Sequence, residues 1–289
     1  MITGLRRSSL YVPGDNAGMI NKSLSMPADV LVLNLEDGVA TSKKDEARAN
    51  IVKALQSLDF GEHEVVIRVN SLACETGLRD VRAVIPCRPD GICLPKIEEA
   101  GEIRAADTLV CRLETDNGIP NGLIRLHAMI ESASGVVHAA AVARASRRMA
   151  SLMFGSADYA KDLRCHPGED RSELEFALQM IVTAARAGGI DAIDAPCFAV
   201  RDAELLRREA AQVRRLGYEG KSAIHPSQLE IINGIFDATP DEIAWAENVL
   251  VELREAENRG KALTTIEGRL IENPHRTAAE RILRRRQKL

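Results

Sequence analysis

Two carboxylates that follow neighbouring apolar runs are the residues of this sequence best suited to chemistry. Glu131 follows the apolar residues 126–130, and Asp158 closes the run 152–158. Each run is typical of a short buried strand, so we expect each acid at the carboxyl end of its strand. Two carboxylates that lie close together repel each other, and a divalent cation such as Mg²⁺ removes the repulsion. The pair therefore favours a metal site, although either acid alone would also suit a helix cap or an ion pair with lysine.

Arg68 lies within the apolar run 64–69, which we expect to be a strand. A guanidinium that is buried without a partner is costly. We therefore expect Arg68 to pair with Glu36 or Asp37 at the end of the preceding strand, to bind a substrate carboxylate through its planar fork, or to do both.

Glu36 and Asp37 end the apolar run 30–35. In a functional role, they would orient the waters of a metal ion or the Arg68 guanidinium. The structural alternative is capping of the helix expected at 41–57, and we favour it for Asp37 because Asp is a common N-cap residue.

Four further polar residues, Asn70, Lys96, Asp194 and His225, also follow apolar runs. Their positions make them candidates for the same site. His225 precedes Pro226 and could act as a general acid or base. We favour a structural hydrogen-bonding role for it.

Eight short apolar runs alternate with helical patterns, and this order indicates a parallel sheet. The runs are residues 9–12, 30–35, 64–69, 91–94, 126–130, 152–154, 192–193 and 222–224, and helical patterns cover 42–57, 134–145, 171–187 and 202–216. Eight repeats in about 225 residues suit an α/β fold of the TIM (β/α)8 barrel type, in which the carboxyl ends of the strands meet at one mouth. An open doubly wound sheet is the alternative, but the chain has no G-x-G-x-x-G after its first run.

We expect the barrel to occupy residues 1–235 and a C-terminal tail to occupy 236–289. The tail pattern predicts a helix from an N-cap at Thr239 to about Asn258, two extended segments at 263–266 and 269–271, and a basic helix at about 277–288. The tail is too short for a separate domain, so we expect it to pack on the barrel or on a neighbouring subunit.

Composition excludes several classes of partner. The formal net charge is −4 and aromatic residues make up 3% of the chain, which argues against nucleic acid and anionic membranes as partners. No apolar stretch approaches the roughly 20 residues of a membrane helix. The six cysteines form no C-x-x-C pair, and the first residues lack a signal-peptide pattern. We therefore expect a cytoplasmic protein with reduced thiols.

Several motifs, in their order and spacing, resemble a known family. They are 7–14 (RSSLYVPG), 35–39 (LEDGV), 67–70 (IRVN), 94–96 (LPK), 129–132 (MIES), 154–158 (FGSAD) and 220–226 (GKSAIHP). From about residue 7 to about residue 281, the chain resembles the citrate lyase β-subunit-like proteins, within the wider group of HpcH/HpaI aldolases and malyl-CoA or citramalyl-CoA lyases.

The resemblance implies a TIM barrel that binds Mg²⁺ through Glu131 and Asp158, with Arg68 and Glu131 in contact with the oxoacid part of the substrate. It also implies a coenzyme A site near Tyr11, Lys22, Ile224 and His225. Members are commonly homotrimers or larger homo-oligomers in which the tail covers a neighbour's active site.

The sequence departs from the family pattern at Glu272. Relatives that act alone on acyl-CoA thioesters have a catalytic Asp in a Gly-x-Met-(Ile/Val)-Asp segment, and here residues 268–274 read GRLIENP. The change alters the intrinsic pKa by about 0.4 units. It also lengthens the side chain by one methylene, and a misplacement of about 1 Å can lower a rate on the order of a hundredfold.

The resemblance predicts an oxo-acid lyase that needs Mg²⁺ and uses Arg68 and Glu272 as catalytic residues. It would cleave a 3-hydroxyacyl-CoA such as citryl-CoA, citramalyl-CoA or malyl-CoA to acetyl-CoA and an oxoacid. The alternatives are a malyl-CoA-type thioester hydrolase and a non-catalytic subunit of a citrate lyase-like complex.

Overall fold

A computed structural model describes residues 4–166, 168 and 170–286 of the chain. The chain divides into two compact units, Met1–Ile235 and Phe236–Leu289. Each unit is described by itself.

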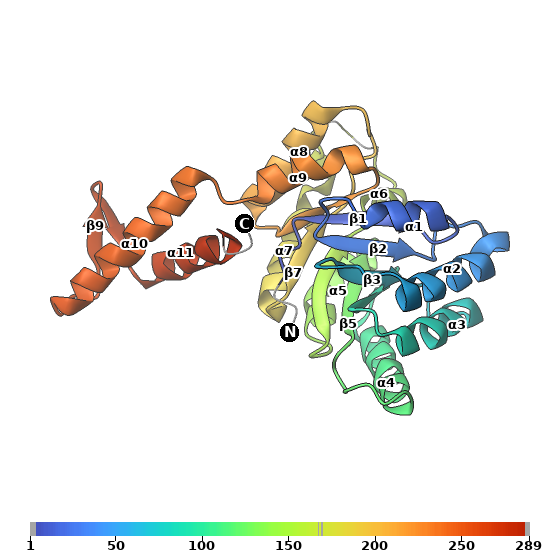
Figure 1. The fold of residues 1–289 in the computed structure, drawn as a ribbon. Coiled ribbons are helices and arrows are strands. Elements are labelled where there is room, and N and C mark those ends of the chain that lie inside the picture. The colour runs from blue at the N-terminus through green and yellow to red at the C-terminus, as the bar shows by residue number, and fades with distance from the viewer. Residues whose placement is uncertain (1–3, 167, 169, 287–289) are drawn as a thin grey trace. The chain divides into compact units, whose positions relative to one another are not determined.

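The first unit is a closed parallel barrel in which the order of strands around the barrel follows the order along the chain (Figure 1). Its described strands are β1 (Ser8–Pro13), β2 (Val30–Asn34), β3 (Glu64–Arg68), β4 (Gly91–Leu94), β5 (Arg125–Ile130), β6 (Met149–Phe154), β7 (Asp191–Asp194) and β8 (Gly220–Ala223). Pairing of β1 with β8 closes the barrel, through partners such as Ser9 and Ser222. The expected TIM (β/α)8 fold is confirmed.

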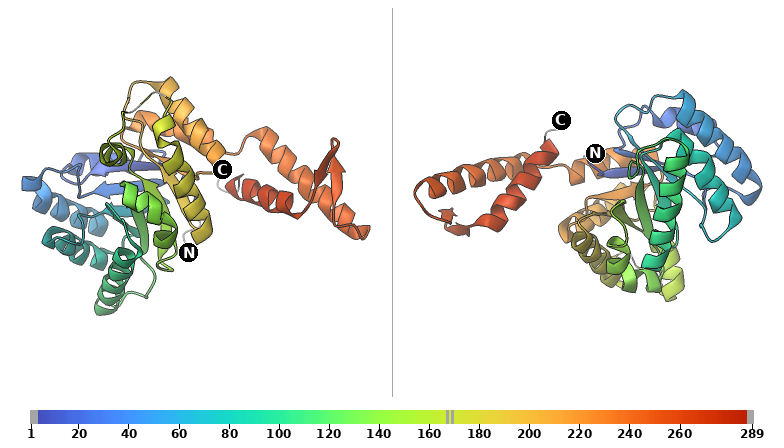
Figure 2. Two further views of the ribbon diagram at one scale, coloured as in Figure 1. Left: turned by 180° about the vertical axis from the view of Figure 1, so that it is seen from behind. Right: turned by 90° about the horizontal axis from the view of Figure 1, so that it is seen from below.

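Helices lie outside the strands (Figure 2). They are α1 (Ala17–Ser23), α2 (Lys44–Ser57), α3 (Glu75–Val84), α4 (Ala100–Asp116), α5 (Ala133–Ala143), α6 (Ser156–Leu163), α7 (Glu175–Gly188), α8 (Ala203–Leu216) and α9 (Leu229–Phe236). The sequence pattern predicts α2, α5, α7 and α8 but not the other five. Three of these, α1, α6 and α9, have only seven or eight residues. Such short helices contain too few turns for a clear period of 3.6 residues.

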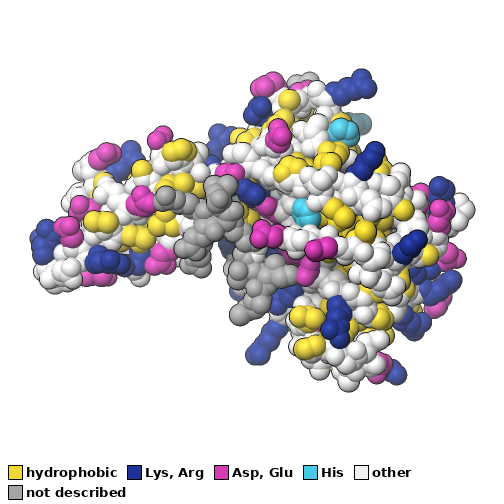
Figure 3. All heavy atoms as spheres, viewed as in Figure 1, with side chains coloured by type: hydrophobic (Ala, Val, Ile, Leu, Met, Phe, Trp, Pro, Cys, Tyr) yellow, Lys and Arg dark blue, Asp and Glu magenta, His cyan; other side chains and the backbone are white. Residues whose placement is uncertain are grey.

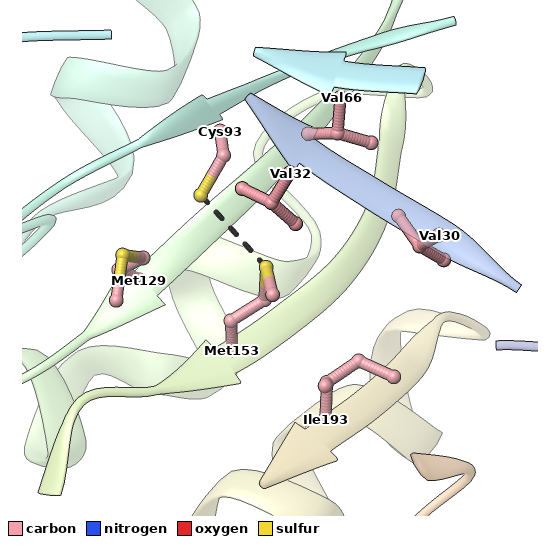
Figure 4. Packing of buried hydrophobic residues seen from close by; sticks show 7 residues of the cluster. All are labelled: Val30, Val32, Val66, Cys93, Met129, Met153 and Ile193. Carbon is pink, nitrogen blue, oxygen red and sulfur yellow. Dashed lines mark hydrogen bonds between the residues drawn. The ribbon is translucent and has the colours of Figure 1, made fainter. Parts of the chain in front are cut away.

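Apolar side chains from alternate strand positions fill the interior of the barrel (Figure 4). The cluster is Val30, Val32, Val66, Cys93, Met129, Met153 and Ile193, and Tyr11 packs against it. Successive side chains on a strand point to opposite faces, so the residue two positions further along continues the inward face. The inward face therefore passes from Val32 to Asn34 and from Val66 to Arg68, where polar residues begin.

The same alternation turns Asp194 away from the barrel interior, because its neighbour Ile193 points inward. Asp194 is fully buried and accepts hydrogen bonds from Lys221 Nζ at 2.6 Å and from Arg171 at 2.8 and 3.0 Å. Lys221 lies on the adjacent strand β8, in register with Asp194. The expectation that Asp194 belongs to the mouth is therefore wrong, and its carboxylate belongs to a buried ion cluster outside the strands.

Ion pairs occupy the opposite end of the barrel, where the strands begin. Arg6 contacts Glu64 and Asp191, the first residues of β3 and β7, at 2.6 Å each. His127 is buried beside them, with Nδ1 2.8 Å from Ser151 Oγ and Nε2 3.7 Å from Glu64 Oε1. The pKa of His127 is lowered to about 4, mainly by burial, with Glu64 opposing the shift and Arg6 and Arg125 adding to it.

The second unit has a small core of its own. Helix α10 (Pro240–Asn258), the antiparallel strands β9 (Thr264–Ile266) and β10 (Arg269–Ile271) and helix α11 (Asn273–Arg286) surround it. The core residues are Ala246, Val249, Leu253, Ile271 and Ala279. Thr239 caps α10 as expected, in a capping box with Glu242. The predicted final helix begins four residues earlier than expected, and its residues 287–288 lie outside the described part of the chain.

Among the described residues, no helix combines the length and apolar character needed to cross a bilayer. On the face that Figure 3 shows, Lys and Arg side chains alternate with Asp and Glu, and neither sign gathers into one large patch.

We predict that His127 lowers the stability of the protein as the pH decreases below 6.5. Its pKa is below the value of 6.5 that it has when unfolded, so protons bind preferentially to the unfolded chain as the pH drops below 6.5. Between pH 6.5 and pH 5, the free energy of unfolding should fall by about 2 kcal/mol more in the wild type than in His127→Gln. Chemical denaturation at several pH values measures this. The control His166→Gln, at an exposed position, should keep the wild-type slope, and equal slopes in all three proteins would contradict the prediction.

Candidate active site

The carboxyl ends of the barrel strands surround a cavity of about 670 Å³. The predicted site residues that line it are Tyr11, Lys22, Asp37, Arg68, Glu131, Asp158, Ile224 and His225. Glu36 lies behind this lining, where its carboxylate contacts Arg68. The structure thus brings these nine residues together at one mouth. Asp194 and Asn70 do not line the cavity, since Asp194 pairs with Lys221 and Asn70 donates to Asp80 and to the Leu35 carbonyl.

Glu131 is held in place by its neighbours. It directly follows β5 and is 3% exposed, and its Oε1 accepts a hydrogen bond from the backbone N–H of Lys96 at 2.8 Å. A Cβ atom on Gly155 would lie 2.3 Å from Glu131 Oε2 and 2.5 Å from Glu131 Cβ. Only glycine at position 155 therefore leaves room for this carboxylate.

Asp158 lies in the first turn of α6 and not at the end of a strand. Strand β6 ends at Phe154, and the helix begins two residues later with Ser156. The small residues after Phe154 suit the start of a helix as well as a strand. For this reason the apolar run 152–158 wrongly predicted that the strand extends to Asp158. An acid in the first turn interacts favourably with the helix dipole. Burial raises the pKa of Glu131 against the Arg68 charge and the Lys96 N–H, which lower it, and the Asp158 charge adds to the rise. Both carboxylates line the same cavity.

Arg68 is 8% exposed and has three neighbours around its guanidinium. One terminal nitrogen lies 2.8 Å from Glu36 Oε2 and 3.9 Å from Glu131 Oε2. The guanidinium carbon lies 5.8 Å from the centre of the Tyr11 ring, within the range of a cation–π contact. The expected ion pair with Glu36 is therefore present. The buried Nε has no hydrogen-bond partner among the described residues, so Arg68 retains donor capacity for a ligand.

Asp37 does not cap the helix that follows it. Ala40 is the N-cap of the short 3-10 turn Thr41–Lys43, and Lys43 is the N-cap of α2. The Asp37 carboxylate is instead 3.4 Å from Lys96 Nζ, which is also 3.4 Å from Glu36 Oε1. The expectation of a capping role is wrong because the chain makes a turn of several residues between the strand and the helix.

Tyr11 and the rim residues occupy different depths of the cavity. Tyr11 packs against the barrel interior, with its hydroxyl 3.9 Å from Met129 Sδ, and burial raises its pKa. Lys22, Ile224 and His225 are exposed at the rim. His225 Nδ1 lies 2.8 Å from Ser227 Oγ and accepts from the Ser227 N–H, which matches the structural role that we favoured.

Apolar residues of the cavity wall are the part of the site that the sequence analysis missed. Met19 and Phe198, about half or more exposed, line the cavity together with Met26 and Pro196. Met19 and Lys22 are three residues apart in α1, whereas Met26 lies beyond its end at Ser23, so the sequence carries only a weak signal for this wall. Phe198 follows β7 in a loop and carries no such signal.

Glu272 belongs to the second unit. It lies between β10 and α11 and is exposed, and its backbone N–H donates to His275 Nδ1 at 3.2 Å. The structure describes it only within that unit.

Residues 7–226 match the family model for HpcH/HpaI aldolase/citrate lyase. The chain belongs to this family. Residues 174–288 also match the model for C–C bond lyases of the TIM-barrel fold. The resemblance that the motifs indicated is therefore confirmed.

Relatives within this family align with nearly the whole chain. The citrate lyase subunit beta of Leuconostoc mesenteroides subsp. cremoris is 36% identical over 280 residues, covering 97% of this chain and 93% of the relative. A (3S)-malyl-CoA thioesterase of Cereibacter sphaeroides is 35% identical over 277 residues, covering 96% and 93%. The solved structure of the CitE protein of Mycobacterium tuberculosis in complex with magnesium, acetoacetate and coenzyme A is 28% identical, has a TM-score of 0.79 and covers 99% of each chain.

We predict that Gly155→Ala destabilises the protein by forcing Glu131 out of its position. The φ angle of Gly155 is −107°, which any residue can adopt, so the effect comes from the clash alone. Overpacking of this kind costs about 1–3 kcal/mol, measured as the free energy of unfolding in denaturant. The control Gly234→Ala, in α9 with nothing within 4 Å of the added Cβ, should not destabilise. Equal stability of the two variants would contradict the prediction.

Proposed function

We propose that the protein is a Mg²⁺-dependent carbon–carbon lyase that cleaves a 3-hydroxyacyl-CoA, such as citryl-CoA, citramalyl-CoA or malyl-CoA, to acetyl-CoA and an oxoacid. The observation that carries the proposal is the meeting of Arg68 with the carboxylates of Glu131 and Asp158 in one cavity. The family, and the CitE protein in complex with magnesium, acetoacetate and coenzyme A, support it.

The residues at the mouth fit Mg²⁺. Glu131 and Asp158 offer hard oxygen ligands, and the Asp158 charge opposes ionisation of Glu131, which a bound cation would offset. The space that Gly155 leaves keeps the Glu131 carboxylate at the cavity. Among the described residues, no group of three or more His, Cys, Asp or Glu is placed to hold a metal. The proposed site has two protein carboxylates, within the one or two that Mg²⁺ usually takes.

In the proposed reaction, Arg68 binds the carboxylate of the substrate and offsets the charge on the developing carbonyl oxygen. Glu36 and the Tyr11 ring hold the guanidinium in position for this. A bound Mg²⁺ would lower the pKa of the substrate hydroxyl and polarise the carbonyl group. The substrate hydroxyl loses its proton to solvent as its C–O bond becomes the carbonyl of the oxoacid. The electrons of the broken C–C bond move to the carbon next to the thioester, where Glu272 delivers a proton.

The rim of the cavity suits the coenzyme A part of the substrate. We assign the exposed Lys22 and His225 to its polar groups, and Ile224 with the apolar wall to its aliphatic arm. Tyr11 lies deeper, beside Arg68, so we assign it to the acyl end. We further propose a homotrimer or larger homo-oligomer in which the second unit of a neighbouring subunit supplies Glu272.

Hydrolysis of a malyl-CoA-type thioester is the second candidate, because a relative named as a (3S)-malyl-CoA thioesterase is 35% identical. The products distinguish the two reactions. A lyase releases acetyl-CoA and an oxoacid, whereas a hydrolase releases free coenzyme A and the intact hydroxyacid. A non-catalytic subunit of a citrate lyase-like complex would give neither from the purified chain.

We predict that Glu131→Gln and Asp158→Asn each lower Mg²⁺-dependent cleavage by on the order of a hundredfold or more, because each removes a charged ligand from the site. Citryl-CoA, citramalyl-CoA and malyl-CoA are supplied with Mg²⁺, and acetyl-CoA, free coenzyme A and oxoacid are measured separately. Glu62→Gln, an exposed position in the first unit, is the control. Full activity of Glu131→Gln would rule out this metal assignment.

We predict that Glu272→Gln loses activity while Mg²⁺ affinity is kept, and that Glu272→Asp, which restores the family residue, stays active. Mixing and reassembling the inactive Glu272→Gln and Glu131→Gln proteins should restore partial activity, because some sites then combine an intact barrel with an intact Glu272. Absence of any restored activity after subunit exchange would contradict a shared site.

A further inference from the structure

Lys96 contacts two separate pairs of carboxylates at the mouth of the barrel. Its backbone N–H donates to Glu131 Oε1 at 2.8 Å, and Glu131 forms one pair with Asp158, which lines the same cavity. Its Nζ lies 3.4 Å from both Glu36 Oε1 and Asp37 Oδ2, which form the other pair. One residue thus touches both candidate positions for a cation.

The backbone of Lys96 explains how it reaches both pairs. Its φ is +53°, in the left-handed region that costs a non-glycine residue about 1–2 kcal/mol. The next residue, Ile97, donates to Met129 O at 3.1 Å, which anchors the segment beside β5. The left-handed turn therefore directs the N–H of Lys96 to Glu131, while its side chain extends to Glu36 and Asp37.

The positive charges at the mouth are shared unevenly among its four carboxylates, Glu36, Asp37, Glu131 and Asp158. The Lys44 ammonium also lies on the side of Glu36, 2.7 Å from the carbonyl oxygens of Leu35 and Glu36. Arg68 and Lys96 both contact the Glu36 carboxylate, and Lys96 also contacts Asp37. The only described cationic side-chain contact to Glu131 is with Arg68, at 3.9 Å. The negative charge that is left without a close counter-ion therefore lies mainly at Glu131 and Asp158.

We propose that Lys96 confines the divalent cation to Glu131 and Asp158 by occupying the rival pair, Glu36 and Asp37, with its own ammonium group. Lys96 is thus a positioning residue, because it determines which of the two acidic pairs binds the cation. The proposal rests on the proposed function, because it requires that the mouth binds a divalent cation.

The test counts Mn²⁺ ions bound per chain by electron paramagnetic resonance, with the full chain in its native assembly. Lys96→Gln removes the charge and keeps a side chain of similar length, and Gln, like Lys, is a non-glycine residue in the left-handed conformation. Lys96→Arg keeps the charge. We expect one bound Mn²⁺ in the wild type and in Lys96→Arg, a second Mn²⁺ in Lys96→Gln, and a return to one in Lys96→Gln combined with Asp37→Asn.

Each outcome separates this proposal from the proposed function. One Mn²⁺ with unchanged affinity in Lys96→Gln overturns the role of Lys96 and leaves the metal site intact. A second Mn²⁺ that persists in the double variant also overturns it, because the extra ion then lies elsewhere. No Mn²⁺ on the wild type overturns the metal site itself, and this proposal with it. Lys96→Asn repeats the count with a residue that tolerates the left-handed conformation, should Lys96→Gln fold poorly.

Discussion

Strand alternation in a closed barrel is the constraint on which the rest of the first unit depends. Every second side chain must point inward, and the small interior accepts only a tightly packed apolar set, here Val, Met, Cys and Ile. At the carboxyl ends the same inward positions reach solvent, so polar side chains are tolerated there. Arg68, two residues after Val66, occupies such a position. The register that packs the core therefore also places the chemistry.

The two ends of the barrel differ in how completely their charged side chains are paired. At the end where strands begin, Arg6 joins Glu64 and Asp191 at 2.6 Å, and these contacts pair charge with charge. At the mouth, the pairing is incomplete within the described part of the chain, since Arg68 Nε has no hydrogen-bond partner there and the nearest cationic side-chain nitrogen to Glu131 lies at 3.9 Å. Buried charge without full compensation is costly, and such sites are where ligands supply the missing partner.

Much of the fold follows from local pattern, whereas contacts within the site do not. The apolar runs locate the eight strands to within a few residues, and β4 and β10 match their predicted bounds. The ends of these runs also pointed to Arg68, Glu131 and Asp158, which line one cavity. Local pattern failed where the residue types suit more than one conformation. The segment after Phe154 starts a helix, and the residues after Asp37 form a turn. The position of Asp194 was predicted wrongly because alternation along a strand does not say which of two neighbouring side chains points inward. The packing of Ile193 in the barrel interior decides this.

The sequence by itself determined the barrel, the family and the residue types at the mouth, because these depend on periodicity and motif order that short segments carry. Only the tertiary structure decided which charges meet. Lys96 joins the two acidic pairs through a left-handed backbone, and Gly155 gives Glu131 its space. Both arrangements depend on distances between segments far apart in the chain, which strand register and barrel closure set and no local pattern encodes.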